Sequence, residues 1–357
     1  MVAPKRSSSG DKTMIKPWPA EDLEAVLHCP VCKSPQRNLL HARLVDRAFQ
    51  VADGSWDLYR CTQCASAYLD PRPTPSSIGR AYARYYTHDS PTKLMTNREG
   101  GLRSFTHDLI RGYMNHRYGL SRRPALSFGR WLVPLVPPLR AFAEMRYRHL
   151  PPQPKGGGRV LDVGCGNGEF LALAEEAGWQ AEGVDFDIEA VNAARSLGLT
   201  VRHGGIGLFA DEPQRYDVIT LSHVIEHVHE PSVLLRRLYE LLKPGGMLWL
   251  ETPNIGSLGS RRFGRNWRGL EPPRHLVIFA PKALVNCLQD VGFKDVRRLW
   301  RGISVFEVFA SSEAIAKNEY IGAHHRKRSL RIAHLLAEVW EMGLSSRREF
   351  ITCLAFK

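Results

Sequence analysis

No stretch of about eighteen or more apolar residues occurs in this 357-residue chain, which argues against a membrane-spanning helix. The first ten residues are polar and lack an apolar run, so we expect no secretory signal. Neither internal repeats nor long low-complexity tracts are seen. Seven cysteines, an odd number that falls partly in clustered pairs, fit a reducing compartment better than a disulfide framework. These absences favour a globular, cytoplasmic protein.

Acidic residues are scarce outside one part of the chain. The formal net charge is +13, from 49 Lys and Arg against 36 Asp and Glu. Residues 156–310 hold 17 basic and 19 acidic residues, so the remaining chain holds 32 basic against 17 acidic. The positive charge therefore belongs to the flanks. Basic flanks favour polyanions such as nucleic acid, anionic lipid headgroups or a phosphorylated substrate.

Composition and patterning divide the chain into four regions. We expect a disordered N-terminus over 1–20, a cysteine-containing module over 21–90, a basic helical linker over 91–155 and a larger domain over 156–357. The linker ends in a Pro- and Gly-rich stretch, residues 151–158, which is a strong boundary signal. Beyond it strands and helices alternate, which predicts a parallel sheet with helices on both faces.

The strand pattern of the larger domain is clear. Strands are predicted at 159–163, 181–185, 199–202, 217–221, 246–251, 294–300 and 349–356, and helices at 170–177, 231–242 and 281–291. The strand at 217–221 is apolar throughout, so we expect it to be central and buried on both faces. Residues 302–348, mostly helical in pattern, form an insertion before the last strand.

The first strand runs into a glycine-rich turn at residues 164–168, and the second strand ends at Asp185. Such turns let the backbone approach a ligand, and an acidic residue at this strand end can hydrogen-bond ribose hydroxyls. The spacing is G-x-G-x-G, not the dinucleotide G-x-G-x-x-G. Asp162 and Glu169 would repel a pyrophosphate at this helix N-terminus but suit ammonium and sulfonium charges. A degenerate dinucleotide site and a turn without ligand stay open.

At these residues the chain resembles the class I S-adenosylmethionine (SAM)-dependent methyltransferases, whose first motif is an acidic residue followed by G-x-G-x-G. The resemblance implies an α/β, doubly wound Rossmann-like sheet of seven strands whose last strand is antiparallel, lying between the fifth and sixth. It implies cofactor-binding residues at Asp162, Gly164, Cys165, Gly166, Gly168, Asp185, Phe186 and Ser222. We expect Cys165 to serve as a small packing side chain, not as a nucleophile.

Two CxxC pairs, Cys29/Cys32 and Cys61/Cys64, are separated by 28 residues. Four thiolates in this arrangement can close a tetrahedral zinc site, with residues 48–51 and 56–59 forming a hairpin between them. A redox dithiol or unrelated buried cysteines are the alternatives. The module is similar to the zinc ribbon found ahead of some bacterial sugar and small-molecule methyltransferases. The predicted zinc is structural, because four thiolates leave no open coordination position.

Histidines gather after the fourth predicted strand. Residues 222–229 resemble the E-H-V segment of ubiquinone-biosynthesis O-methyltransferases, and residues 273–279 resemble their P-R-H-L-x-x-F stretch. We therefore predict the catalytic residues His223, Glu226, His227 and His275, with His227 as first choice of general base and His275 as second. In parts of that group a glutamate that helps bind a divalent cation stands where this chain has His223. A metal site at His223, Glu226 and His227 is thus open, as are structural roles.

Together these features predict a SAM-dependent methyltransferase acting at oxygen or carbon of a small-molecule, saccharide or glycolipid acceptor. Residues 261–268 interleave Arg with aromatic residues and suit a carbohydrate or phosphorylated substrate. An RNA methyltransferase and a non-catalytic SAM-binding module are the alternatives. RNA is disfavoured because no Asn/Asp-Pro-Pro-aromatic motif follows the fourth strand. Arg-rich segments with Trp and Leu, at 101–150 and 326–340, favour either contact with the anionic inner face of the membrane or packing on the core.

Overall fold

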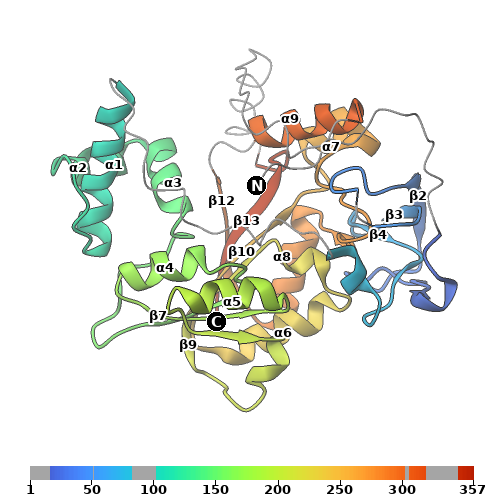
Figure 1. Cartoon of the computed structure of the whole chain (residues 1–357), viewed down its shortest axis with the longest axis horizontal. Coiled ribbons are helices and arrows are strands. Elements are labelled where there is room, and N and C mark those ends of the chain that lie inside the picture. The colour runs from blue at the N-terminus through green and yellow to red at the C-terminus, as the bar shows by residue number, and fades with distance from the viewer. Residues whose placement is uncertain (1–16, 51, 83–101, 302–304, 319–344) are drawn as a thin grey trace.

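The computed structural model describes residues 17–50, 52–82, 102–301, 305–318 and 345–357 (Figure 1). The predicted disordered N-terminus lies outside these residues up to position 16, as does most of the predicted helical insertion. Within the described part of that insertion, α9 spans Val305–Ala316. None of the helices in the described ranges is long and apolar enough to cross a membrane.

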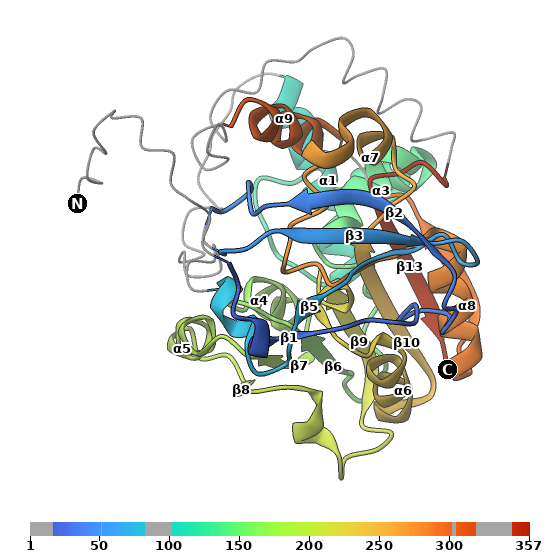
Figure 2. The ribbon, with the colours of Figure 1, turned by 90° about the vertical axis from the view of Figure 1, so that its right-hand side faces the viewer.

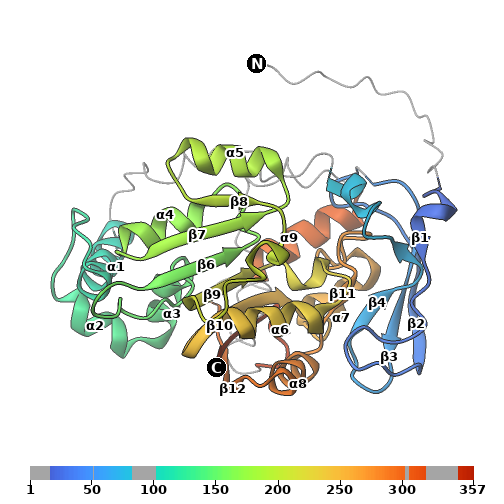
Figure 3. The same ribbon diagram turned by 90° about the horizontal axis from the view of Figure 1, so that it is seen from below.

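A seven-stranded sheet forms the centre of the molecule (Figure 3). Its strands are β6 (Arg159–Val163), β7 (Gln180–Asp185), β8 (Val201–His203), β9 (Tyr216–Ser222), β10 (Leu242–Pro253), β12 (Lys294–Leu299) and β13 (Phe350–Phe356). They lie in the order β12-β13-β10-β9-β6-β7-β8, and β13 is antiparallel to both of its neighbours. This order confirms the predicted Rossmann-like sheet with its antiparallel last strand between the fifth and sixth.

Helices cover both faces of this sheet. They are α4 (Glu169–Glu176), α5 (Ile188–Ser196), α6 (Pro231–Leu241) and α8 (Pro281–Val291), whereas α7 (Leu258–Phe263) packs against α9. Alternate strand residues enter two separate cores: Leu161 packs with α6, α8 and the cysteine module, whereas Val160 packs with α4 and α5. Central strands buried on both faces explain why β9 reads as apolar throughout.

The cysteine module has a small sheet of its own, with the order β11-β4-β3-β2. Its strands are β2 (Arg37–Leu44), β3 (Trp56–Cys61), β4 (Ala67–Leu69) and β11 (Val277–Ile278), while β1 (Leu23–Glu24) pairs with β5 (Arg72–Pro73). Because β11 comes from the larger domain and pairs with β4, the two predicted modules share one sheet. Figure 2 shows β2 and β3 side by side in this module.

The predicted hairpin between residues 48–51 and 56–59 was wrong. The partner of β3 is β2, and the described residues between them form bends. Asp46 accepts hydrogen bonds from the backbone N–H groups of Phe49 and Ala52, both at 3.1 Å. Those N–H groups are used in a local turn, so they are not available to a strand ladder.

Three helices precede the larger domain: α1 (Leu102–Tyr118), α2 (Gly129–Leu135) and α3 (Pro137–Met145). Helices α1 and α2 touch closely, since a Cβ atom added at Gly129 of α2 would lie 2.0 Å from the carbonyl oxygen of Leu109 in α1. Ion pairs join this helical unit to α4, through Arg122 with Glu176 and Arg146 with Glu169. The unit lies at the opposite end of the molecule from β2–β4 (Figures 1 and 3).

Candidate functional site

The glycine turn links β6 to α4 with backbone conformations that only glycine adopts easily. Gly164, Gly166 and Gly168 have φ values of 71°, 52° and 82°. Space is short as well, because a Cβ at Gly164 would lie 2.3 Å from Val224 Cγ2 and one at Gly168 would lie 2.4 Å from Leu199 Cδ1. A Cβ atom therefore does not fit at Gly164 or Gly168, and no side chain at these two positions covers the backbone of the turn.

Asp185, at the end of β7, lies directly beside this turn. Its carboxylate accepts hydrogen bonds from the N–H groups of Gly166 at 2.7 Å and Asp187 at 2.9 Å. Burial raises the pKa of Asp185, and these N–H groups oppose that rise. The ring of Phe186 is 78% exposed. A carboxylate with remaining lone pairs beside an open aromatic ring fits the ribose and base of a nucleoside.

Two of the other predicted cofactor residues, Asp162 and Cys165, are buried next to the turn. Asp162 is fully buried, and its Oδ1 accepts hydrogen bonds from Thr220 Oγ1 at 2.8 Å and from Arg148. Burial raises its pKa. Cys165 is buried against Gly183, and burial raises the pKa of its thiol, which suits packing more than nucleophilic chemistry. Ser222 ends β9 next to Glu251 of β10.

At the same edge of the sheet, His223 is held between two carboxylates. Its Nδ1 lies 3.2 Å from Glu226 Oε1 and its Nε2 lies 3.3 Å from Glu251 Oε1. Burial opposes the charged imidazole, but the two carboxylates outweigh burial and raise the pKa of His223 to about 9. Burial likewise opposes ionisation of Glu226, yet the hydrogen bond and charge of His223 bring its pKa to about 2. Both ring nitrogens of His223 thus donate hydrogen bonds, and neither has a free lone pair.

His227 and His275 form a second pair, with ring centroids 4.8 Å apart. Nδ1 of His227 lies 2.9 Å from the carbonyl oxygen of Arg274, and Nδ1 of His275 lies 2.8 Å from that of Gly269. A carbonyl only accepts, so both Nδ1 atoms carry the proton and both Nε2 atoms keep a lone pair. Burial lowers the pKa of both imidazoles, so they are neutral near pH 7.

The structure thus brings the four predicted catalytic residues to one edge of the sheet. Glu226, His227 and His275 each offer one donor atom, and these atoms lie within 4.8 Å of one another. Sequence reasoning missed Glu251, although it ends the fifth strand at the same edge. It also missed Tyr82 of the cysteine module, whose hydroxyl lies 3.0 Å from His227 Nδ1.

A buried ion pair connects the cysteine module to the histidines. Asp46 and Arg274 both have fully buried side chains, and their bidentate contacts measure 2.6 and 3.1 Å. The same guanidinium donates to the carbonyl oxygen of Ala81 at 2.9 Å. Burial opposes ionisation of Asp46, but Arg274 outweighs burial and lowers the pKa of Asp46. Because the backbone carbonyl of Arg274 holds His227, this ion pair fixes the position of the histidine.

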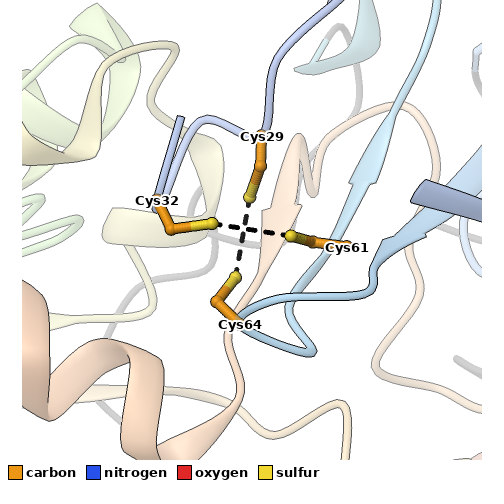
Figure 4. Close-up of side chains that lie close together, drawn as sticks. All are labelled: Cys29, Cys32, Cys61 and Cys64. Atoms are coloured by element: carbon orange, nitrogen blue, oxygen red, sulfur yellow. Dashed lines mark hydrogen bonds between the residues drawn. The ribbon is translucent and has the colours of Figure 1, made fainter. Parts of the chain in front are cut away.

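The four cysteines of the two CxxC pairs converge on one point (Figure 4). Sγ of Cys29 lies 3.6 Å from that of Cys64, and Sγ of Cys32 lies 3.5 Å from that of Cys61. A tetrahedron with zinc–sulfur bonds of about 2.3 Å places its sulfur atoms roughly 3.8 Å apart. The observed spacing therefore fits a Zn(Cys)4 site without rearrangement.

The loop after β10 differs from the expectation of a stacking surface for carbohydrate. Trp267 is 2% exposed, and its indole N–H donates to Glu349 Oε2 at 2.9 Å. The ring of Phe263 packs edge-on against Phe309. Both aromatic side chains thus help to anchor the loop, and burial shows that the predicted stacking role was wrong for Trp267.

Sheet order and glycine turn define the class of protein. Residues 139–298 match the family described as a methyltransferase domain. The chain therefore contains a class I SAM-dependent methyltransferase domain, as the sequence predicted.

Among known proteins, the chain is similar to ubiquinone biosynthesis O-methyltransferases. It is 33% identical over 152 residues to that of Xanthomonas euvesicatoria, covering 39% of this chain and 62% of the relative. Identity with the protein of Proteus mirabilis is 33% over 126 residues, covering 33% and 51%. The chain thus spans only part of the length of these relatives. A solved SAM-dependent methyltransferase from Archaeoglobus fulgidus covers 61% of this chain with 23% identity and a TM-score of 0.41, 93% of that structure being covered.

Proposed function

We propose that this protein transfers the methyl group of SAM to an oxygen atom of a small-molecule acceptor, with His227 as general base. The observation that carries the proposal is the pair of neutral imidazoles, His227 and His275, whose Nε2 lone pairs are free at the sheet edge that also holds the glycine turn. The relatives named as O-methyltransferases support oxygen as the methylated atom.

The described residues fit SAM. Three features support this fit: glycines at 164, 166 and 168, the carboxylate of Asp185 beside their turn, and the exposed ring of Phe186. In the proposal Asp185 accepts hydrogen bonds from the ribose hydroxyls and Phe186 contacts the base. SAM, when bound, supplies an electrophilic methyl group on a sulfonium. The carboxylate of Asp162 is buried and accepts hydrogen bonds from Thr220 and Arg148. In the proposal Asp162 therefore supports the glycine turn and does not contact SAM itself.

The proposed reaction needs alignment and a base. Hydroxyls of phenols or saccharides become better nucleophiles as they lose their proton. Nε2 of His227 accepts that proton, while the carbonyl of Arg274 holds the opposite nitrogen and so fixes ring and tautomer. Glu226, ionised and fully buried beside the ring, stabilises the imidazolium that results. His275 is the alternative base, with the same Nδ1 arrangement.

A divalent cation is a second way for this cluster to act. Glu226, His227 and His275 offer one carboxylate oxygen and two imidazole nitrogens that lie within 4.8 Å of one another, a donor set that suits a divalent cation. His223 is excluded from that set, because both its nitrogens bind carboxylates. In the predicted set of metal ligands, His275 therefore replaces His223. A chelator that lowers activity, with restoration by added metal, would favour this version over a free base.

We also propose that the module predicted at 21–90 binds a structural zinc through Cys29, Cys32, Cys61 and Cys64. The sulfur spacing supports this assignment, and four thiolates close the coordination sphere. The module takes part in the active site through Tyr82 and Asp46, and no reaction step passes through the metal.

The proposal extends to the chemical class of the acceptor. Quinone-like, saccharide and lipid-linked molecules all carry suitable hydroxyls. The protein, incubated with radiolabelled SAM and with lipid, glycan and RNA fractions of cell extract, is expected to label the lipid or glycan fraction. Label in RNA alone would favour the RNA alternative. Heat measured on SAM binding without label in any fraction would favour the non-catalytic module, and absence of SAM binding would refute the proposal outright.

A further inference from the structure

Exposed hydrophobic side chains gather on the helical unit α1–α3. Half of the large hydrophobic residues that are exposed in the described chain lie there: Phe105, Phe128, Trp131, Leu132, Leu135, Val136 and Phe142. Trp131 and Leu135 are 60% and 76% exposed and lie one turn apart on α2, so they point to the same side. Val133, between them, is fully buried and anchors the helix. We call Trp131, Leu132, Leu135 and Val136 the α2 face.

Unpaired arginines border this face. The guanidinium of Arg130 lies 3.9 Å from the ring centre of Trp131, and Arg123 is exposed nearby in the loop before α2. Neither makes an ion pair with another described residue. Both line a hollow of about 690 Å³ between α1 and α2, together with His116 and Asn115. Arg130 therefore lies both beside the apolar α2 face and on the lining of this basic hollow.

Acidic residues do not neutralise this charge. Between positions 105 and 148 the chain has two, Asp108 and Glu144. Asp108 is paired with Arg111, and Glu144 is buried and paired with Arg140. Close packing of α2 on α1, where Gly129 meets the backbone of Leu109, holds the face in a fixed position on α1.

We propose that the α2 face is a docking surface for an anionic phospholipid bilayer, on which the protein binds peripherally. Trp131 and Leu135 enter the boundary between headgroups and acyl chains, and Arg123 and Arg130 bind lipid phosphates. A second copy of the chain fits poorly, because two faces of the same positive charge repel each other. RNA would engage the arginines but leave the apolar ridge in water.

Docking here would hold the methyltransferase domain in a set orientation. Helix α3 is joined to the domain at Arg146–Glu169, and Arg148 reaches Asp162 beneath the glycine turn. The surface stands apart from the cysteine module and the histidines, so the proposal does not rest on the identity of the acceptor. It agrees with a lipid-linked or membrane-dissolved acceptor.

The test is co-sedimentation of the full chain with vesicles of phosphatidylcholine alone or mixed with phosphatidylglycerol, at low and high salt. Binding is expected on the anionic vesicles and is expected to weaken with salt. The double variant Trp131→Ala/Leu135→Ala should bind about tenfold or more weakly. The double variant Arg123→Gln/Arg130→Gln should lose about fivefold per arginine on anionic vesicles only.

Leu197→Ala and Val233→Ala are matched controls, because these side chains, just after α5 and on α6, are 52% and 57% exposed. They should leave vesicle binding unchanged, and SAM binding measured by calorimetry should be unchanged in every variant. Equal binding of wild type and Trp131→Ala/Leu135→Ala would overturn the proposal. A wild-type dimer that Trp131→Ala/Leu135→Ala dissociates would also overturn it, because the face would then belong to a second copy. Release of the protein from vesicles by a low concentration of inorganic phosphate would overturn it as well.

Discussion

The ion pair between Asp46 and Arg274 gives the sharpest test of how the two modules work together. Both side chains are fully buried, and Asp46 also accepts two backbone N–H bonds. Asp46→Ala removes the bidentate partner of the buried Arg274 guanidinium and leaves Glu271, at 3.6 Å from Nε, as its remaining carboxylate. Removing one partner of such a pair costs about 3–5 kcal/mol, far more than an exposed pair is worth. The loss should appear as a lower free energy of unfolding in urea.

A second consequence concerns the active site. With Asp46 removed, the loop that presents the Arg274 carbonyl loses its attachment to the cysteine module, so His227 loses its fixed orientation. Methyl transfer should therefore fall. SAM affinity should be nearly unchanged, because Asp185 and Gly166 depend on β6 and β7 and not on this loop. Calorimetry with SAM and the labelling assay separate the two effects.

The chain offers a matched control. Lys33 and Glu230 also join the cysteine module to the methyltransferase domain, at 3.2 Å, but their side chains are 59% and 54% exposed. Glu230→Ala should cost less than about 1 kcal/mol. The double change Asp46→Leu/Arg274→Met removes both buried charges and should recover much of the lost stability. A loss for Asp46→Ala no larger than for Glu230→Ala would refute the reasoning.

Zinc, the histidine pair and the buried acid of α3 each lead to a further prediction. Cys61→Ser should release the metal and abolish methyl transfer while SAM binding persists; loss of SAM binding as well would contradict a local role. His227→Asn should slow methyl transfer about 10²–10⁴-fold. Because burial lowers the pKa of His227 and the neutral form is the base, the wild-type rate should rise with pH to a plateau whose midpoint lies below about 6.5; a midpoint above it would argue against this base. Burial opposes ionisation of Glu144, but His149, Tyr113 and two arginines bring its pKa to about 2, below the ordinary 4.5. The ionised Glu144 contributes stability on the order of 3 kcal/mol, which is present above pH 4.5 and lost towards pH 2. Glu144→Gln should therefore lower the free energy of unfolding in urea at pH 7 but not at pH 2.

Much of the site was accessible from local patterns. The glycine spacing and the carboxylate at position 185 identified the cofactor class, because each strand–turn–helix unit is encoded within a short segment. His223 and His227 could be placed at this edge, because they follow β9 and parallel strands end at the same edge of a sheet. The error over residues 48–51 arose because a carboxylate turn at Asp46 uses the N–H groups that a strand would need.

The sequence by itself determined the sheet, the SAM turn and the four cysteines, because short-range spacing encodes each of them. Only the tertiary structure decided which residues complete the histidine cluster. Tyr82 reaches His227 across 145 positions, and Asp46 reaches Arg274 across 228. Contacts at such separations leave no periodic pattern in the chain. They arise when β11 joins the sheet of the cysteine module and brings two distant segments against each other.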